Sequence, residues 1–283
     1  MKIIDLHVHS TCSDGTYTPT ELIDYAIEKG LSAIALTDHD TLDGYNEFME
    51  YGKTKGIETV PGIEFSADNY GREIHILGLY LNSDCEELNT SLEKLRQDRA
   101  TRNDRMLAKL NELGFDITKE DLMEGLAPDT VITRAHFARA LINKGYVKTK
   151  DEAFDKYIGD GGPAYIPKAE LKSKECIELI HKAGGISVLA HPFLYKYDMQ
   201  GVTNLIRGLA KDGLDGVETY YSTHTKEQVQ HLKTVANNLG LFLTGGSDFH
   251  GDNKPGLDLA VGYGELCIPY ELLPVVKAHV KTV

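Results

Sequence analysis

Short apolar runs alternate with amphipathic stretches in two parts of the chain, and this pattern predicts strands alternating with helices. In the first part the expected strands are Ile3–Val8, Ala33–Thr37, Thr59–Phe65 and Ile74–Leu81. The alternation resumes at Ser173, with strands expected at Ile186–Ala190, Gly216–Thr219 and Leu241–Gly245 and a last amphipathic segment at about Tyr270–Lys281. Such alternation is typical of an α/β fold with a mainly parallel sheet. Seven strands with intervening helices indicate a closed or nearly closed α/β barrel.

The first two helices have clear start and stop signals. Thr18 is expected as an N-cap, with Pro19 at the first helical position and Glu21 completing a capping box. This helix should end at Gly30, and a second one, from about Leu42 to Lys55, should stop at Gly56.

The middle of the chain is rich in helix formers and charge and shows no strand-like run. Helical patterns cover Leu92–Leu113, Lys119–Leu126, Arg134–Lys144 and Lys150–Tyr157, and Gly159-Asp160-Gly161-Gly162-Pro163 then breaks the pattern. We therefore expect a barrel domain formed by residues 1–99 and 169–283, with residues 100–168 as a helical insertion that caps the substrate site.

Histidine and acidic side chains interrupt the apolar pattern at the ends of strands or close to them. His7 and His9 are two residues apart and would face the same side of a strand, and Asp248 and His250 repeat this spacing. The carboxyl ends of strands are where α/β barrels build active sites. Imidazole and carboxylate groups bind divalent ions, and a carboxylate can bridge two of them. The candidate ligands, enough for two or three ions, are His7, His9, Asp14, His39, Glu64, His75, His191, Asp248 and His250.

An ordinary core or surface role is the alternative for each histidine taken alone. This alternative is less favoured for the candidate ligands, because six of the eleven histidines lie at strand ends or close to them. His181, His231 and His279 fall in helical patterns and are expected to be structural or solvent-facing. Cys12 lies near the first motif, but the oxygen and nitrogen donors there suffice without it.

Composition and charge narrow the function. The chain is 41% hydrophobic and 26% charged, as in ordinary soluble proteins. It has no apolar run of about 20 residues and no signal-peptide pattern, and its four cysteines form no CxxC pair, so we expect a cytoplasmic protein with free thiols. The net charge of −13 argues against binding long nucleic acid. Bound cations would make the pocket locally positive, which suits a small phosphorylated substrate.

The ordered motifs resemble those of the PHP (polymerase and histidinol phosphatase) family over nearly the whole chain. They are His7-Val-His9, Ser-Asp14-Gly, Thr-Asp38-His39-Asp40, Pro-Gly-Ile-Glu64, His75, Ala-His191-Pro and Gly-Ser-Asp248-Phe-His250. The helical insertion resembles the branch that acts on AMP and nucleoside 3′,5′-bisphosphates, which also includes a 5′-exonuclease of short RNA.

This resemblance implies a distorted (β/α)7 barrel with three divalent ions, Mn²⁺, Fe²⁺ or Zn²⁺, among which ligand type alone does not choose. It implies that His7, His9, Glu64 and Asp248 hold one ion. Glu64 would bridge to a second ion, held also by His75 and His191. The third would be bound by Asp14, His39 and His250.

Two further residues are candidates for handling the substrate. Arg134 resembles the family arginine that clamps a phosphate, a role that suits a planar guanidinium, although a surface helix charge is the alternative. His224 follows a strand end and could donate to phosphate or protonate the leaving group, or be a loop histidine. The loop Gly159–Pro163 departs from the family pattern because it carries no Lys or Arg. A preference for bisphosphates over monophosphates is therefore open.

We expect a metal-dependent phosphatase that hydrolyses small phosphomonoesters by a metal-activated hydroxide, with nucleotides (AMP or nucleoside 3′,5′-bisphosphates) as substrates. The enzymatic alternatives are histidinol phosphate phosphatase and a 5′-exonuclease of short oligonucleotides. A metal-stabilised binding module without turnover is an alternative of another class, which loss of ligands would favour. The sequence gives no indication of oligomeric state.

Overall fold

The strands form one sheet that nearly closes into a barrel. The computed structural model describes residues 2–126, 130–167 and 170–280. In these ranges the sheet follows the order β1-β2-β3-β4-β6-β7-β8, and β5 pairs with β3. Leu6, just after β1, donates its backbone N–H to the carbonyl of Gly245 in β8 at 3.1 Å, so the two ends of the sheet meet. The strands are β1 (Ile3–Asp5), β2 (Leu31–Leu36), β3 (Glu58–Asn69), β4 (Arg72–Leu79), β5 (Leu171–Lys172), β6 (Ile186–Leu189), β7 (Gly216–Tyr221) and β8 (Phe242–Gly246).

The expected α/β barrel with a mainly parallel sheet is confirmed, and one strand on the sheet path, β4, runs antiparallel. β4 is antiparallel to both of its neighbours, β3 and β6. The cause is a tight turn in place of a crossover helix, at Tyr70 and Gly71, which both have positive φ. β3 also runs on to Asn69, so Glu64 lies inside this strand and not at its end. The path holds the seven expected strands, and β5 is an additional short strand.

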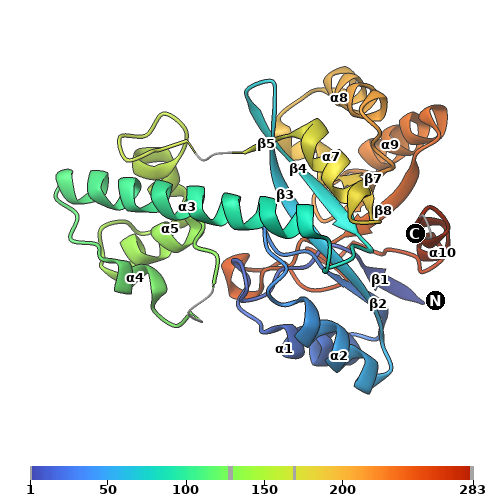
Figure 1. Ribbon diagram of the computed structural model, residues 1–283, viewed down its shortest axis with the longest axis horizontal. Helices are drawn as coiled ribbons and strands as arrows, with labels where there is room; N and C mark the ends of the chain where they lie inside the picture. The colour runs from blue at the N-terminus through green and yellow to red at the C-terminus, as the bar shows by residue number, and fades with distance from the viewer. Residues whose placement is uncertain (1, 127–129, 168–169, 281–283) are drawn as a thin grey trace.

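Helices cover the outside of the barrel. In Figure 1, α1 (Pro19–Glu28) and α2 (Tyr45–Lys55) lie together on one side, and α7 (Ser173–Lys182), α8 (Met199–Lys211) and α9 (Lys226–Leu239) lie on the other. The capping box of α1 is confirmed: Thr18 Oγ1 accepts from the Glu21 backbone N–H at 3.2 Å, and Glu21 accepts from the Thr18 N–H at 2.8 Å. Short 3-10 turns, Pro192–Tyr195 and Gly251–Asn253, follow β6 and β8.

The middle of the chain forms a helical unit that projects from the barrel (Figure 1). Its elements are α3 (Glu86–Glu112), α4 (Lys119–Met123), α5 (Arg134–Asn143), α6 (Lys150–Ala153) and a π-helical turn at Phe154–Ile158. Leu88, Leu92 and Leu95 of α3 pack in a core cluster of the barrel. Met106 and Leu110, further along the same helix, pack in a separate cluster with Phe137 and Leu141 of α5.

The helical unit therefore has its own core, and α3 runs without interruption from the barrel into it. We propose residues 100–168 as a cap on the barrel, with a boundary that falls inside α3. Residues 168 and 169, at the other boundary, lie outside the described residues. So does Lys281, while α10 (Leu272–Ala278) forms within the expected last helical segment. None of the helices in the described ranges is long and apolar enough to cross a membrane.

Candidate metal centre

Glu64 lies at the centre of the histidine cluster. Its Oε1 is 3.2 Å from His7 Nε2, and its Oε2 is 3.2 Å from His9 Nε2. Two more rings approach Oε1, with His75 Nδ1 at 2.8 Å and His191 Nε2 at 3.0 Å. The carboxylate is 1% exposed, and these imidazole nitrogens lie around it. The long strand β3 carries Glu64 into this position, and β4 brings His75 beside it.

Asp248 closes the first group of donors. Its Oδ1 lies 3.6 Å from His7 Nε2 and 3.4 Å from His9 Nε2. Its Oδ2 faces away and accepts hydrogen bonds from Tyr221 Oη, at 2.8 Å, and from the Lys254 ammonium. Asp248 has a positive φ of 60°, a conformation that non-glycine residues rarely adopt. One oxygen is thus held by the protein, and the other is presented to the histidines.

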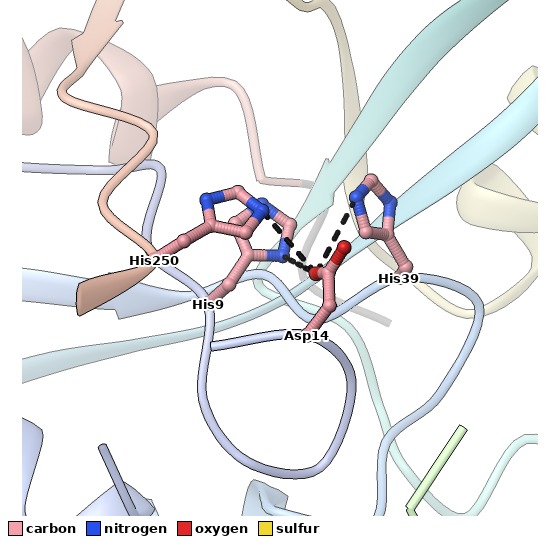
Figure 2. A group of neighbouring side chains, drawn as sticks. All are labelled: His9, Asp14, His39 and His250. Atoms are coloured by element: carbon pink, nitrogen blue, oxygen red, sulfur yellow. Dashed lines mark ion pairs between the residues drawn. The ribbon is translucent and has the colours of Figure 1, made fainter. Parts of the chain in front are cut away.

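Asp14 gathers a second group on the other side of His9 (Figure 2). Its Oδ1 is 3.2 Å from His250 Nε2, 3.8 Å from His39 Nε2 and 3.9 Å from His9 Nδ1. Asp38 fixes the loop that carries Asp14. Its carboxylate accepts hydrogen bonds from the Ser10 backbone N–H at 2.8 Å and from Ser13 Oγ at 2.5 Å.

The spacing of the donors fits metal coordination. Two ligands of one tetrahedral ion, each about 2.1 Å from it, lie about 3.4 Å apart. The four contacts that join His7 and His9 to Glu64 and Asp248 measure 3.2, 3.6, 3.2 and 3.4 Å. The structure brings all nine candidate ligands into overlapping groups whose donor atoms lie within 4.8 Å of one another; the groups are His9, Asp14, His39 and His250; His7, His191 and Asp248; His7, His9 and Glu64; and His39, Glu64 and His75.

Buried donor atoms in these groups lack hydrogen-bond partners among the described residues. They include His7 Nε2, both ring nitrogens of His9, Asp14 Oδ1, His39 Nδ1 and Glu64 Oε2. A buried polar atom without a partner costs roughly 1–3 kcal/mol. Divalent ions between these atoms would satisfy them together, so the residues present fit a metal centre.

The electrostatics of the cluster favour positive charge at its middle. Burial works against the charged form of Glu64, but the surrounding His75, His7 and His39 hold the pKa of Glu64 well below its usual range. Burial likewise opposes protonation of His9, yet Asp248 and Glu64 raise its pKa to about 9. By contrast, burial and the neighbouring His9 and Lys254 lower the pKa of His250 to about 4. The ionised carboxylates therefore attract a cation, and a metal ion that binds His9 would displace its proton.

Glu218 is a buried supporting residue that the sequence analysis did not single out. Its Oε1 lies 3.0 Å from His7 Nδ1, and its Oε2 accepts from the backbone N–H of His191 at 2.7 Å. A carboxylate behind a ligating histidine fixes the ring so that its other nitrogen faces the metal. The signal available in the sequence was an acid inside the apolar run of β7, between Val217 and Thr219.

Asp5 is a second buried acidic residue that supports the site, and it lies two positions before His7. It accepts from the backbone N–H groups of Ser247 and Ala260, both at 2.9 Å. Burial raises the pKa of Asp5 to about 6 despite these hydrogen bonds. Asp5 thereby joins β1 to the segment that carries Asp248.

A cleft of about 170 Å³ is lined by the candidate ligands Asp14, His39 and His75 and also by Arg134 from the helical unit. Arg134 donates to Asp160 Oδ1 at 3.0 Å and to Glu73 Oε2 at 3.4 Å. Arg134 of the helical unit therefore lines the same cavity as three of the candidate ligands.

His224 is not among the residues that line this cleft. Its Nδ1 lies 3.0 Å from the Thr219 carbonyl, its ring packs on Phe193 and Tyr221, and it lines a separate cavity of about 490 Å³. Cys12 is absent from the donor groups of the described chain, and burial raises the pKa of its thiol to about 12.

The three histidines that were expected to be structural or solvent-facing have partners away from the cluster. His181 lies 2.7 Å from Asp215, His231 contacts Thr203 at 2.9 Å, and His279 contacts the Val275 carbonyl at 2.8 Å.

Comparison with known proteins places this site in a family. The PHP domain model matches residues 5–246. A 5′-3′ exoribonuclease of Haemophilus influenzae is 38% identical over 249 residues, covering 88% of this chain and 90% of the relative. A 3′,5′-nucleoside bisphosphate phosphatase of Chromobacterium violaceum is 34% identical over 266 residues, covering 94% and 92%. A solved structure from Bifidobacterium adolescentis, described as a metal-dependent phosphoesterase, superposes with a TM-score of 0.89 at 29% identity, covering 100% of this chain and 98% of that one. This chain belongs to the PHP domain family of metal-dependent phosphoesterases.

Proposed function

We propose that this protein hydrolyses a phosphomonoester of a small, nucleotide-like substrate at a centre of three divalent ions. The observation that carries the proposal is the shared cavity: metal ligands and the guanidinium of Arg134 line one cleft. Ligands alone would support a structural metal site. A guanidinium that lines the same cleft adds a group that binds phosphate.

The proposed ligand sets are those that the family resemblance implies. His7, His9, Glu64 and Asp248 would hold one ion, and their donor spacing of 3.2–3.6 Å supports this set. A second ion would lie between Glu64, His75 and His191. The third would be bound by Asp14, His39 and His250. His9 Nδ1 also approaches Asp14, but at 3.9 Å, so we assign the ring to the first ion through Nε2. Mn²⁺, Fe²⁺ and Zn²⁺ all suit these donors.

When bound, such ions activate water as a nucleophile and offset the charge on phosphoryl oxygens. The protein's own side chains position the metal ligands and bind the substrate. Glu218 holds the His7 ring in place, and Asp38 fixes the loop of Asp14. Arg134 binds the phosphate by exchanging its contacts with Asp160 and Glu73 for phosphate oxygens. For His224 we propose a role in substrate binding that acts from the neighbouring cavity, because Tyr221 both packs on its ring and donates to Asp248.

A second candidate function is the trimming of short oligonucleotides from the 5′ end. The observation in its favour is the 38% identity to a protein named as a 5′-3′ exoribonuclease. This candidate is compatible with the charge of the chain, since the negative net charge argues only against binding of long nucleic acid.

Initial rates of phosphate or nucleotide release by the Mn²⁺-loaded protein test the proposal. The substrates are nucleoside 5′-monophosphates, nucleoside 3′,5′-bisphosphates, histidinol phosphate and 5′-phosphorylated short oligonucleotides. We expect turnover of the nucleotides. Turnover of histidinol phosphate alone would replace the proposed substrate class, and no release from any substrate would favour a binding module.

A further inference from the structure

The helical unit is attached to the loop that carries Asp14. Just before α5, Thr130 Oγ1 donates to the carbonyl of Thr11 at 2.9 Å. The backbone N–H of Val131 donates to the carbonyl of Cys12 at 3.1 Å. These contacts join segments of the chain that are 119 positions apart. One edge of the metal centre therefore depends on the helical unit as well as on the barrel.

Thr133 extends this attachment to the carboxylate of Asp14 itself. Its Oγ1 donates to Asp14 Oδ2 at 3.4 Å, and each of the two residues is 8% exposed. Among the described residues no other donor forms a hydrogen bond with Oδ2. The other oxygen, Oδ1, faces the rings of His9, His39 and His250 (Figure 2). Thr133 thus fixes which oxygen is presented to the histidines.

Two acceptors lie equally close to the Thr133 hydroxyl. Asp14 Oδ2 and His136 Nδ1 are each 3.4 Å from Oγ1. His136 Nδ1 already accepts from the backbone N–H of Thr133 at 2.9 Å. A carboxylate is the stronger acceptor, because hydrogen bonds to a charged group are about twice as strong as those between neutral groups. The hydroxyl therefore donates its proton to Asp14, while its oxygen accepts from the Ala135 N–H at 3.2 Å as an N-cap does.

The same turn of α5 carries the proposed phosphate clamp. Arg134 directly follows Thr133, and both residues line the cleft together with Asp14. Because the two residues share one helical turn, a displacement of α5 that moves the Arg134 guanidinium also moves the Thr133 hydroxyl. A phosphate that holds Arg134 in the cleft would therefore hold Asp14 in place as well.

The other carboxylate with one anchored oxygen, Asp248, is anchored by the barrel instead. Its Oδ2 accepts from Tyr221 and Lys254. Tyr221 ends β7, and Lys254 follows the short turn after β8. Through Thr133 the helical unit therefore acts on the ion that Asp14 would bind with the rings of His39 and His250, here named the Asp14 ion.

We propose that Thr133 is a positioning residue for Asp14. Through it, the Asp14 ion and the phosphate held by Arg134 bind cooperatively. The inference rests on the proposed function and adds a form of regulation to that site. Binding of either partner holds the first turn of α5 where the other needs it. Linkage makes the effect reciprocal, so phosphate raises the affinity for this ion by the factor by which the ion raises the affinity for phosphate.

The first test measures Mn²⁺ affinity at free concentrations set by a chelator of known affinity. Thr133→Val keeps the shape of the side chain and removes the hydroxyl, whereas Thr133→Ser keeps the hydroxyl. Thr118→Val is the matched control, because Thr118 caps α4 of the same helical unit through the Asp121 N–H and is not among the residues that line the cleft.

We expect Thr133→Val to lower the affinity for one of the ions by about tenfold and to leave the affinity for the others unchanged. This loss is at the lower end of the range for outer partners of metal ligands, because the 3.4 Å contact is long. Thr133→Ser and Thr118→Val should bind Mn²⁺ like the wild type.

The second test repeats each titration with saturating inorganic phosphate. In the wild type, phosphate should raise the affinity for the same ion by about fivefold or more, the usual size of a coupling between sites. Part of this rise comes from direct contact between phosphate and the ions, and that part survives in every variant. Thr133→Val and Arg134→Ala should each lose the part carried by α5. The double variant should lose no more than either single one, because residues that act as one unit are not additive.

Two results would overturn the inference. If Thr133→Val binds Mn²⁺ like the wild type, or loses no more affinity than Thr118→Val, then Thr133 does not position Asp14. If phosphate has the same effect on the wild type and on Thr133→Val, or if the losses in the double variant are additive, then α5 does not couple the two sites. Thr133→Gly removes the hydroxyl at an N-cap position that tolerates Gly, so the same loss of affinity is expected even if Val disturbs α5.

These titrations need no turnover, so they are read separately from the proposed function. Failure of the proposed function appears as no hydrolysis of any nucleotide by the Mn²⁺-loaded wild type. An active enzyme whose variants show additive losses would overturn the coupling and leave the proposed function intact.

Discussion

Replacing Glu218 by Gln should loosen the metal centre without removing a ligand. The carboxylate serves two donors at once, His7 Nδ1 at 3.0 Å and the backbone N–H of His191 at 2.7 Å. Gln keeps one accepting oxygen and places an NH₂ group against the other donor. One charge-assisted hydrogen bond is lost, worth roughly 1.5–3 kcal/mol. Since outer partners of metal ligands typically contribute 10- to 100-fold in affinity, we expect the affinity for the weakest-bound ion to fall by about that factor.

The assay is a competition titration of Mn²⁺ or Zn²⁺ against a chelator of known affinity, followed by initial rates at saturating metal. Glu178→Gln, on the exposed face of α7, removes one carboxylate elsewhere and is the control. We expect the variant to recover most of its activity when metal is saturating, because all nine ligands remain. Unchanged metal affinity in Glu218→Gln would refute the reasoning that this carboxylate orients the His7 ring.

Three further predictions concern the clamp, the histidines and pH. Arg134→Ala should lower kcat/KM by roughly 10- to 200-fold at unchanged metal content. Arg134→Lys should recover part of this loss, because a point charge cannot form the two parallel hydrogen bonds of a guanidinium. Wild-type rates in both variants would show that Arg134 does not bind the phosphate. His191→Ala should cost several orders of magnitude in kcat, whereas His181→Ala, which loses only a contact to Asp215, should retain kcat; comparable losses would mean that structural and catalytic histidines are misassigned. Burial lowers the pKa of His136 from 6.5 to about 4, so the unfolded chain binds the proton first as pH falls. Stability contributed by the neutral ring is complete above pH 6.5 and is lost towards pH 4, by roughly 3 kcal/mol. His136→Gln preserves a capping-box residue and should make the free energy of unfolding, measured by chemical denaturation, less dependent on pH in this range. An unaltered pH dependence would show that His136 is not the group responsible.

Local signals in the sequence were sufficient for the parts of the fold and site that depend on neighbouring residues. The helix start at Thr18 follows from a capping box contained within four residues. The pairing of His7 with His9 follows from the alternation of an extended chain, which places both rings on one side. Both features depend only on residues a few positions apart, so the sequence pattern predicts them before any tertiary contact is known.

Features that depend on long-range pairing could not be read in this way. β4 turns back against β3, and β3 continues to Asn69, because the two strands satisfy each other's backbone groups over eight residue pairs. Glu218 supports His7 across 211 positions of sequence. Its acidic side chain inside an apolar strand was visible, but its partner was not.

The central claim, that nine side chains form one multinuclear centre that hydrolyses a phosphate ester, is tested most directly by measuring metal content and activity on the same samples. Wild-type protein is partly depleted with chelator in steps, and each sample is analysed for bound ions per chain and for initial rate of nucleotide hydrolysis. The account predicts two to three transition-metal ions in the active protein and a rate that falls to background as they are removed. At most one ion per chain, with full activity retained in chelator, would contradict it.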